Sequence, residues 1–334
     1  MNKLHETAKR LMQQGKGILA ADESDHTANA RLKAAGVEPT EENRRRYRDL
    51  LFTTPGIEEY LSGVILFDET MRQSTLSGMP FPQYLLSKEI LVGIKVDEGK
   101  NEVPGGEVTK GLEGLRERVN EYKSMGASFT KWRAVARVGD GYADPVIKEN
   151  AKRLAEYAAI VQEFHMVPIV EPEVLMDGVH SAEDAEGAII ETVAIVFDAL
   201  KTGGIDIPGT ILKTSMAVSG KDAAERAEPV EVAARTVHAL ETAVPDTVGG
   251  VVFLSGGQTP EEAAANLNAI ARIEPLPWDI TFSFARALQS PALDEWAGKD
   301  ENRDEAQSVF LKRLSLAVAA DAGGYAKGME NEAL

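Results

Sequence analysis

Eight short apolar segments alternate with longer amphipathic segments along this chain, and the alternation limits what the chain can fold into. A short apolar run between turn residues is typical of a buried strand, whereas apolar residues at every third or fourth position indicate a helix. Strands that alternate with helices form a parallel sheet. The expected strands are Gly17–Ala21, Gly63–Phe67, Leu91–Val96, Ala127–Val135, Val167–Val170, Gly209–Leu212, Gly250–Leu254 and Ile280–Phe284.

Helical periodicity is clearest in four of the connecting segments, which are Gly111–Lys123, Asn150–Phe164, Glu231–Ala243 and Pro260–Ile270. Eight strand and helix units without a long linker favour a closed (β/α)8 TIM barrel over an open, doubly wound sheet. No Gly-x-Gly-x-x-Gly motif opens a helix after a strand, which argues against a dinucleotide-binding sheet. We therefore predict one α/β domain of parallel strands over residues 1–319 and a C-terminal tail over residues 320–334.

Composition excludes several classes of function. The 334 residues are 43% hydrophobic, which suffices for a large core. A net charge of −17 argues against nucleic acid as a partner, because phosphates repel an acidic surface. The N-terminal residues lack a signal-peptide core, and the apolar stretch Ala188–Leu200 is interrupted by Glu191 and Asp198. We expect no membrane partner, a cytoplasmic location and, without cysteine, no thiolate chemistry.

Two other groups of residues are expected to be structural. Five scattered histidines have no metal-ligand spacing, so neither a metal nor another cofactor is expected. Arg44, Arg45, Arg46 and Arg48 form a basic run. The i, i+4 pairs of Glu41 with Arg45 and of Glu42 with Arg46 predict a solvated helix face rather than a nucleic-acid site. The histidines are His5, His26, His165, His180 and His238.

Polar residues gather where the expected strands end, which is the face that carries the active site in such barrels. Three pairs are spaced i, i+2, so each pair shares one face of its strand. We expect these pairs to converge with the polar residues that end the other strands. The pairs are Lys95 and Asp97, Lys131 and Arg133, and Glu171 and Glu173; the other residues are Asp22, Glu23, Ser24, Asp68, Glu69, Lys213, Ser255, Gly256, Gly257 and Arg286.

Lys213 closes an apolar run, where an ammonium group is costly to bury. Lowering a lysine pKa from about 10.4 to about 7 takes roughly 4–5 kcal/mol, and Lys131 is the candidate neighbouring cation. A neutral amine attacks carbonyls to form Schiff bases, and Glu171, Glu173 and Asp22 are available for the proton transfers. The residue alone leaves a structural ion pair open as the alternative.

Groups suited to phosphate lie at the same barrel end. Ser255, Gly256 and Gly257 form a turn before a helix, where backbone N–H groups can bind an anion, although such turns are often only structural. Arg286, together with Arg133 and Lys95, adds cations that bind phosphate oxygens. Cations on opposite sides of the barrel predict a substrate with two phosphates.

Ordered motifs over nearly the whole chain closely resemble class I fructose-1,6-bisphosphate aldolase. The resemblance implies reversible cleavage of fructose 1,6-bisphosphate to dihydroxyacetone phosphate and glyceraldehyde 3-phosphate, in glycolysis and gluconeogenesis, by a homo-oligomer, a tetramer in the family. The motifs are GKGILAADES at 15–24, GIKVD at 93–97, FTKWR at 129–133, VPIVEPE at 167–173, GTILK at 209–213, FLSGGQ at 253–258 and NLNAI at 266–270.

The resemblance also implies a role for each matching residue. Lys213 would form the Schiff base and Glu171 would be the main acid and base, supported by Lys131, Glu173 and Asp22. The phosphate of the dihydroxyacetone half would bind Ser255, Gly256 and Arg286, whereas the other end of the substrate would lie near Lys95, Arg133, Ser24, Thr27 and Arg31.

The chain departs from the family pattern at several positions. Ala30 stands where many relatives carry a lysine, which puts one phosphate contact in doubt. Leu334 stands last where the animal enzymes end in a tyrosine, so proton exchange by that residue does not carry over. The other departures are Thr214 and Ser215 for Pro and Asn, Asp25 and His26 for Thr and Gly, and Phe284 and Ala285 for Tyr and Gly.

Two alternatives remain open at this point. The first is a Schiff-base aldolase for another phosphosugar, such as a seven-carbon bisphosphate or a monophosphate. The second is a barrel that binds a partner or ligand without catalysing a reaction.

Overall fold

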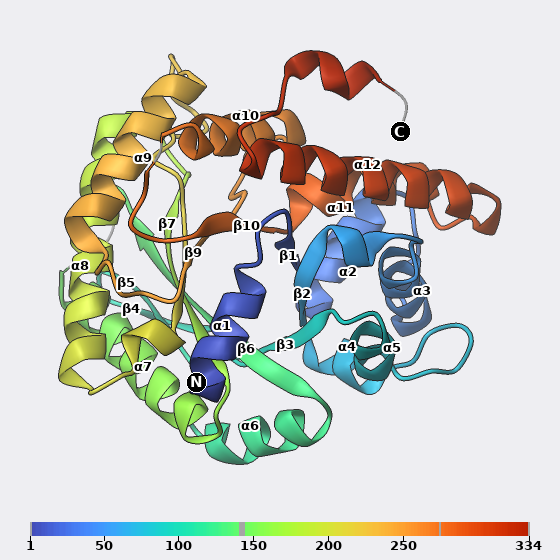
Figure 1. Ribbon diagram of the computed structural model, residues 1–334, viewed down its shortest axis with the longest axis horizontal. Helices are drawn as coiled ribbons and strands as arrows, with labels where there is room; N and C mark the ends of the chain where they lie inside the picture. Colours follow the sequence, from blue (N-terminus) through green and yellow to red (C-terminus); the bar gives the residue numbers. More distant parts are fainter. Residues whose placement is uncertain (1, 140–143, 274, 333–334) are drawn as a thin grey trace.

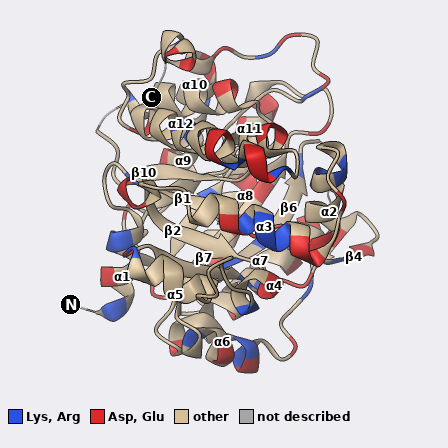
Figure 2. Cartoon of the chain, turned by 90° about the vertical axis from the view of Figure 1, so that its right-hand side faces the viewer, with Lys and Arg blue, Asp and Glu red and all other residues tan. Residues whose placement is uncertain are grey.

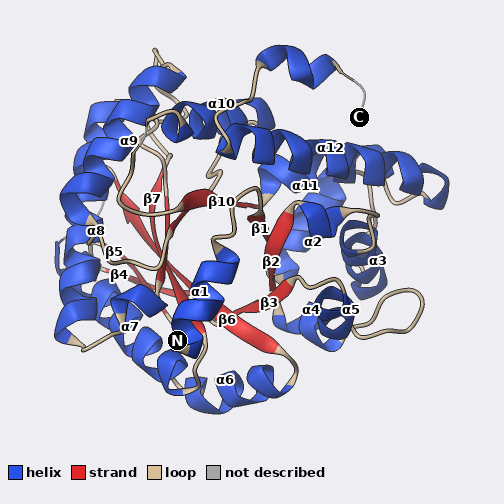
Figure 3. Cartoon of the chain, in the orientation of Figure 1, coloured by secondary structure: helices blue, strands red, loops and turns tan. Residues whose placement is uncertain are grey.

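A closed barrel of eight parallel strands forms the centre of the computed structural model, which describes residues 2–139, 144–273 and 275–332. Around the barrel the strands follow the order β1, β10, β9, β8, β7, β6, β3 and β2. Helices surround them (Figure 3). The barrel strands are β1 Gly17–Ala21, β2 Leu61–Leu66, β3 Leu91–Lys95, β6 Ala127–Arg137, β7 Val167–Leu175, β8 Ile211–Thr214, β9 Val251–Phe253 and β10 Ile280–Phe284.

The predicted barrel is confirmed, and the differences are local. Gly209 is not in a strand, because Ile207–Gly209 form the 3-10 helix η2. Two further strands, β4 Lys100–Val103 and β5 Gly106–Thr109, pair in an antiparallel hairpin after β3. The hairpin was missed because β4 is mostly exposed and lacks an apolar run.

The helices lie outside the barrel except for α1, which lies over one of its ends (Figure 1). A side-chain and backbone capping box starts α10, where Thr259 and Glu262 satisfy each other's backbone N–H groups. None of the described helices is long and apolar enough to cross a membrane. The helices are α1 Lys3–Leu11, α2 Asp25–Ala34, α3 Glu41–Phe52, α4 Asp68–Arg72, α5 Phe81–Ser87, α6 Leu115–Ser124, α7 Asp144–Glu163, α8 Ala182–Thr202, α9 Pro229–Ala243, α10 Pro260–Ala271, α11 Arg286–Trp296 and α12 Arg303–Asp321, with 3-10 turns η1 Ile57–Glu59, η3 Asp300–Asn302 and η4 Lys327–Asn331.

An apolar cluster closes the N-terminal end of the barrel, here called the floor. Leu4 and Leu11 of α1 pack with residues near the starts of the strands, including Phe129 and Val167. Gly93 makes room for this packing, since a Cβ atom there would lie 2.2 Å from the Phe129 ring. With the floor filled by apolar side chains, the polar site is left to the opposite end, here called the mouth.

Candidate active site

A cavity of about 870 Å³ opens at the mouth of the barrel. Its lining brings together residues that are far apart in the sequence and lie at the ends of different strands. Gly257 and Arg31, which the sequence places with this group, do not line it. The predicted site residues that do are Asp22, Ser24, Thr27, Lys95, Lys131, Arg133, Glu171, Glu173, Lys213, Ser255, Gly256 and Arg286.

At the centre of the cavity, the Glu171 carboxylate lies between two lysines. Its Oε1 is 2.9 Å from Lys213 Nζ, and its Oε2 is 3.0 Å from Lys131 Nζ. Asp22 Oδ2 lies 2.7 Å from the same Lys131 ammonium. All four side chains are at most 10% exposed. The result is a buried chain of alternating charges from Asp22 to Lys213.

The neighbouring charges determine whether each of these four side chains is ionised. Burial by itself raises the pKa of Asp22, but the charges of Lys131 and Lys213 outweigh it and lower that pKa to about 2. Burial also opposes ionisation of Glu171, and the same two lysines lower its pKa. For Lys131, burial is outweighed by Asp22 and Glu171, which raise its pKa. Lys131 is therefore a permanent cation beside Lys213, with ionised carboxylates around it at neutral pH.

Strand pairing positions these groups. Strands β6 and β7 run side by side, with Lys131 opposite Ile169 and Arg133 opposite Glu171. Alternate residues of a strand face opposite sides, so Lys131 faces the cavity whereas its neighbour Thr130 faces outward. The outward Thr130 hydroxyl lies 2.7 Å from the buried Tyr157 hydroxyl of α7.

On one side of the cavity, each cation is paired with a carboxylate. Lys95 Nζ lies 2.5 Å from Asp97 Oδ1 and donates to the Asp97 carbonyl at 2.6 Å. Arg133 Nε donates to Glu173 Oε2 at 2.5 Å. These cations would meet a substrate phosphate while already holding an internal anion.

The opposite side of the cavity is built around Ser255, Gly256 and Arg286, the first residue of α11. Within the described part of the chain, Arg286 makes no ion pair, and the buried Ser283 Oγ has no hydrogen-bond partner. Sequence reasoning missed Ser283 because its strand reads as apolar. The available signal was the alternation of Thr281 and Ser283 with two phenylalanines, which places both polar side chains on one face.

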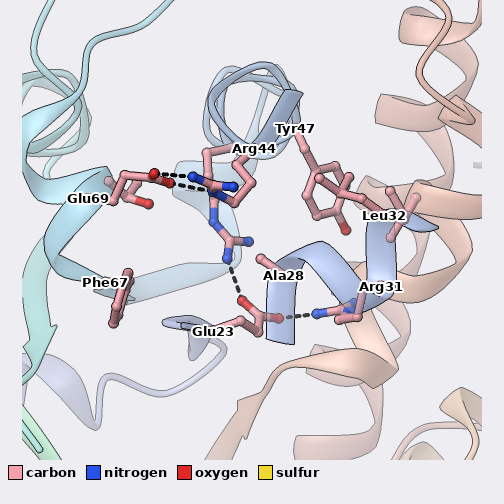
Figure 4. A pocket seen from close by; sticks show the side chains of 11 residues that line it. Glu23, Ala28, Arg31, Leu32, Arg44, Tyr47, Phe67 and Glu69 are labelled. Carbon is pink, nitrogen blue, oxygen red and sulfur yellow. Dashed lines mark hydrogen bonds and ion pairs between the residues drawn. The ribbon is translucent and has the colours of Figure 1, made fainter. Parts of the chain in front are cut away.

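Arg31 lies in a second, smaller pocket beside the mouth (Figure 4). There its guanidinium pairs with one oxygen of Glu23, whose other oxygen accepts from Arg48 Nη2 at 2.5 Å. Arg48 also donates to Gln289 Oε1 at 3.1 Å, and Gln289 donates to the Ala20 carbonyl at 2.6 Å. Glu23 lines both pockets, whereas Arg31 lines only the smaller one.

The prediction of a solvated face for the basic run is wrong for part of the run. Arg48 is only 4% exposed, and Arg44 pairs with Glu69 of α4 in the smaller pocket (Figure 4). Arg45 pairs with Glu42 rather than with Glu41. Basic and acidic segments are interspersed on α3 (Figure 2), but packing against α2 and α11 turns two of the arginines inward.

None of the five histidines lines this cavity. His5 Nε2 is 2.9 Å from Asp206, and His238 Nδ1 is 2.5 Å from Glu186. Across the described residues, no group of three or more His, Cys, Asp or Glu side chains is arranged to hold a metal ion.

A family model described as fructose-bisphosphate aldolase class-I matches residues 3–334. A Xylella fastidiosa protein named probable fructose-bisphosphate aldolase class 1 is 47% identical over 318 residues, which cover 94% of this chain and 95% of that protein. The chain belongs to the class I fructose-bisphosphate aldolase family. An Arabidopsis thaliana relative named fructose-bisphosphate aldolase 4, cytosolic, is 47% identical over 316 residues, covering 93% of this chain and 80% of the relative.

The structure is similar to that of the Plasmodium falciparum aldolase, which was solved in complex with TRAP and a small-molecule inhibitor. The TM-score is 0.95 at 43% identity, covering 98% of this chain and 96% of the other. Like its family, this aldolase is a lyase that cleaves fructose 1,6-bisphosphate reversibly into two triose phosphates through a lysine Schiff base. The function predicted from the sequence is confirmed.

Proposed function

We propose that Lys213 is the Schiff-base lysine of this aldolase and that Glu171 is its acid and base. The supporting observation is the buried contact of 2.9 Å between Lys213 Nζ and Glu171 Oε1. Once Lys213 gives its proton to the Glu171 carboxylate, its nitrogen attacks the ketone carbon, and Glu171 is within reach to pass that proton to the oxygen that leaves as water. Lys131 stays charged beside them, and Asp22 holds it in place.

The bond cleavage follows from the protonated imine. As the hydroxyl on carbon 4 loses its proton, the bond between carbons 3 and 4 breaks, and its electron pair moves toward the iminium nitrogen. Glyceraldehyde 3-phosphate leaves, and an enamine remains on Lys213. Protonation at carbon 3 and attack by water then release dihydroxyacetone phosphate and the free amine. We assign these proton transfers to Glu171, with Glu173 as the nearest second carboxylate on β7.

The phosphates are assigned to the two sides of the cavity. The unpaired side, with Ser255, Gly256, Gly257 and Arg286, would bind the phosphate of the dihydroxyacetone half, called proximal. The other phosphate, called distal, would lie near residues of β3, β6 and α2. In this assignment Gly257 supports the turn, and Arg31 reaches the phosphate only by leaving Glu23. The distal residues are Lys95, Arg133, Ser24, Thr27 and Arg31.

Reductive trapping tests the assignment of the nucleophile. Borohydride added with dihydroxyacetone phosphate should inactivate the enzyme and label the peptide that contains Lys213. The control is the variant Lys213→Met, which should take up no label. Label on another lysine in the wild-type enzyme would overturn the assignment, and activity that requires added zinc after chelation would point to a metal mechanism instead.

We further propose that the protein is a homotetramer. We also propose that it lies in the cytosol, the location that the name of the Arabidopsis relative gives for that protein. The barrel domain is proposed to span residues 1–319 with a tail over 320–334, although α12 itself continues through Asp321. Light scattering coupled to size-exclusion chromatography should give four times the chain mass of 36.1 kDa. The mass of a single chain would contradict the oligomer.

A further inference from the structure

The two phosphate-binding sides of the cavity differ in how their cations are paired. Each cation assigned to the distal side holds a carboxylate: Lys95 holds Asp97, Arg133 holds Glu173, and Arg31 holds Glu23. On the proximal side, Arg286 makes no ion pair within the described residues. A phosphate therefore meets a free cation at one end and neutralised cations at the other.

Of these three carboxylates, Asp97 is the best placed to act on binding of the distal phosphate. Its side chain is 6% exposed and that of Lys95 is 15% exposed, and both residues line the cavity. Besides contacting Lys95 Nζ at 2.5 Å, Asp97 accepts from the Arg133 backbone N–H at 3.3 Å through Oδ2. The carboxylate is thus held between the two strands that carry the distal cations.

Lys95 keeps one donor for a ligand. An ammonium group has three N–H donors; one donates to the Asp97 carbonyl, and the ion pair with the Asp97 carboxylate 2.5 Å away takes up a second. A phosphate that takes the third donor lies close to the Asp97 carboxylate, and like charges repel across a site with restricted solvent. Asp97 therefore positions Lys95 and also weakens its attraction for a phosphate.

We propose that Asp97 is a specificity-determining residue that competes with the distal phosphate for Lys95 and so limits the preference for bisphosphates over 1-monophosphates. The proposal rests on the assignment of Lys95 to the distal phosphate. A 1-monophosphate has no group beside Lys95, so its use does not depend on this competition. The charge of Asp97 then affects one class of substrate and not the other.

The test is Asp97→Asn, which removes the charge and keeps an oxygen for Lys95. We expect the ratio of kcat/KM for fructose 1,6-bisphosphate to that for fructose 1-phosphate to rise about 3- to 10-fold, from the loss of one like-charge repulsion in a partly screened site. Because the ratio compares two substrates on the same protein, general damage to the enzyme cancels. A ratio that is unchanged or lower overturns the proposal; a lower ratio would mean that Asp97 only holds Lys95 in place.

Glu98→Gln is the matched control, because it removes the same charge one residue along the chain. Glu98 also lines the cavity and lies 3.3 Å from Arg118, but among the described residues it makes no hydrogen bond or ion pair with Lys95. We expect the ratio to stay within about 2-fold of the wild type, since an exposed, screened charge contributes little. A rise equal to that of Asp97→Asn would show a general effect of net charge and overturn a specific role for Asp97.

A double variant separates this proposal from the assignment on which it rests. Lys95→Ala should lower the ratio, and adding Asp97→Asn to it should then give no rise, because the competing cation is gone. If Lys95→Ala leaves the ratio unchanged, the assignment of Lys95 fails. If Lys95→Ala lowers the ratio but Asp97→Asn still raises it in the double variant, only the competition fails. Should Asp97→Asn not fold, Asp97→Ser removes the same charge, and the same rise is expected.

Discussion

The floor and the mouth of the barrel are built from the same eight strands, yet the floor is filled by apolar side chains and the mouth by charged ones. At the floor, Phe129 and Leu11 fill the interior with apolar contacts. At the mouth, the four charged side chains of Asp22, Lys131, Glu171 and Lys213 are also buried, and each has an opposite charge within 3.0 Å. The barrel thus holds buried charge only where partners come from several strands.

The pKa values of two buried aspartates, Asp22 and Asp321, also differ with their surroundings. Burial raises the pKa of both, but Lys131 and Lys213 reverse the shift for Asp22 at the mouth. Asp321, at the end of α12 beside Thr281 of β10, has no cation partner among the described residues. Burial therefore raises its pKa to about 7. Neighbouring charges, rather than depth of burial, therefore decide whether a buried carboxyl group is ionised.

The largest effect is expected at the mouth. Glu171→Gln keeps the shape of the side chain but removes its titrating group, so kcat should fall by roughly 10²- to 10⁴-fold. Steady-state kinetics measure this loss, and urea unfolding measured in parallel shows whether the fold is retained. Turnover at the wild-type level would move the acid and base role to Glu173 or Asp22.

At the floor, Phe129→Ala should lower the stability of the protein rather than its kcat. Removing a fully buried ring at the floor should lower the free energy of unfolding by about 3–5 kcal/mol. Activity per folded molecule should stay close to that of the wild type, because the mouth is at the other end of the strands. Phe129→Leu serves as the milder control and should cost less. A large loss of activity at unchanged stability would break the distinction between floor and mouth.

Asp321→Asn should stabilise the protein in a pH-dependent way. Because burial raises the pKa of folded Asp321 from its ordinary value of 3.8 to about 7, ionised Asp321 costs stability as the pH rises from about 4 to 7, by roughly 2–4 kcal/mol in all. The variant should match the wild type below pH 4 and exceed it in free energy of unfolding at pH 8. Urea unfolding over this range measures the gain, and a constant difference at every pH would contradict the assigned cause.

The smallest of these effects is expected for Arg286→Ala at the proximal phosphate. Loss of one charge-assisted hydrogen bond should cost about 1.5–3 kcal/mol, or roughly 10- to 150-fold in kcat/KM. Fructose 1,6-bisphosphate and fructose 1-phosphate share this phosphate, so both should suffer alike. Unequal losses in steady-state kinetics would assign Arg286 to the distal end.

Most of the barrel could be predicted, and the missed parts have physical reasons. Strands β1 and β10 match their predicted limits because turn residues bound both apolar runs. The β4–β5 hairpin has no such pattern, since it is held by backbone pairing rather than by burial of β4. Ser283 was missed for the opposite reason, because two phenylalanines on the same strand hide a polar face.

The barrel and the group of residues that meets at its mouth could be read from the sequence. This was possible because parallel strands end at one edge and the i, i+2 spacing puts paired side chains on one face. Only the tertiary structure decided which charges pair. Glu171 lies between two lysines from other strands, and Arg31 turns to Glu23 and away from the cavity. Such pairs depend on distances of a few ångströms between distant segments, which no periodicity in the sequence specifies.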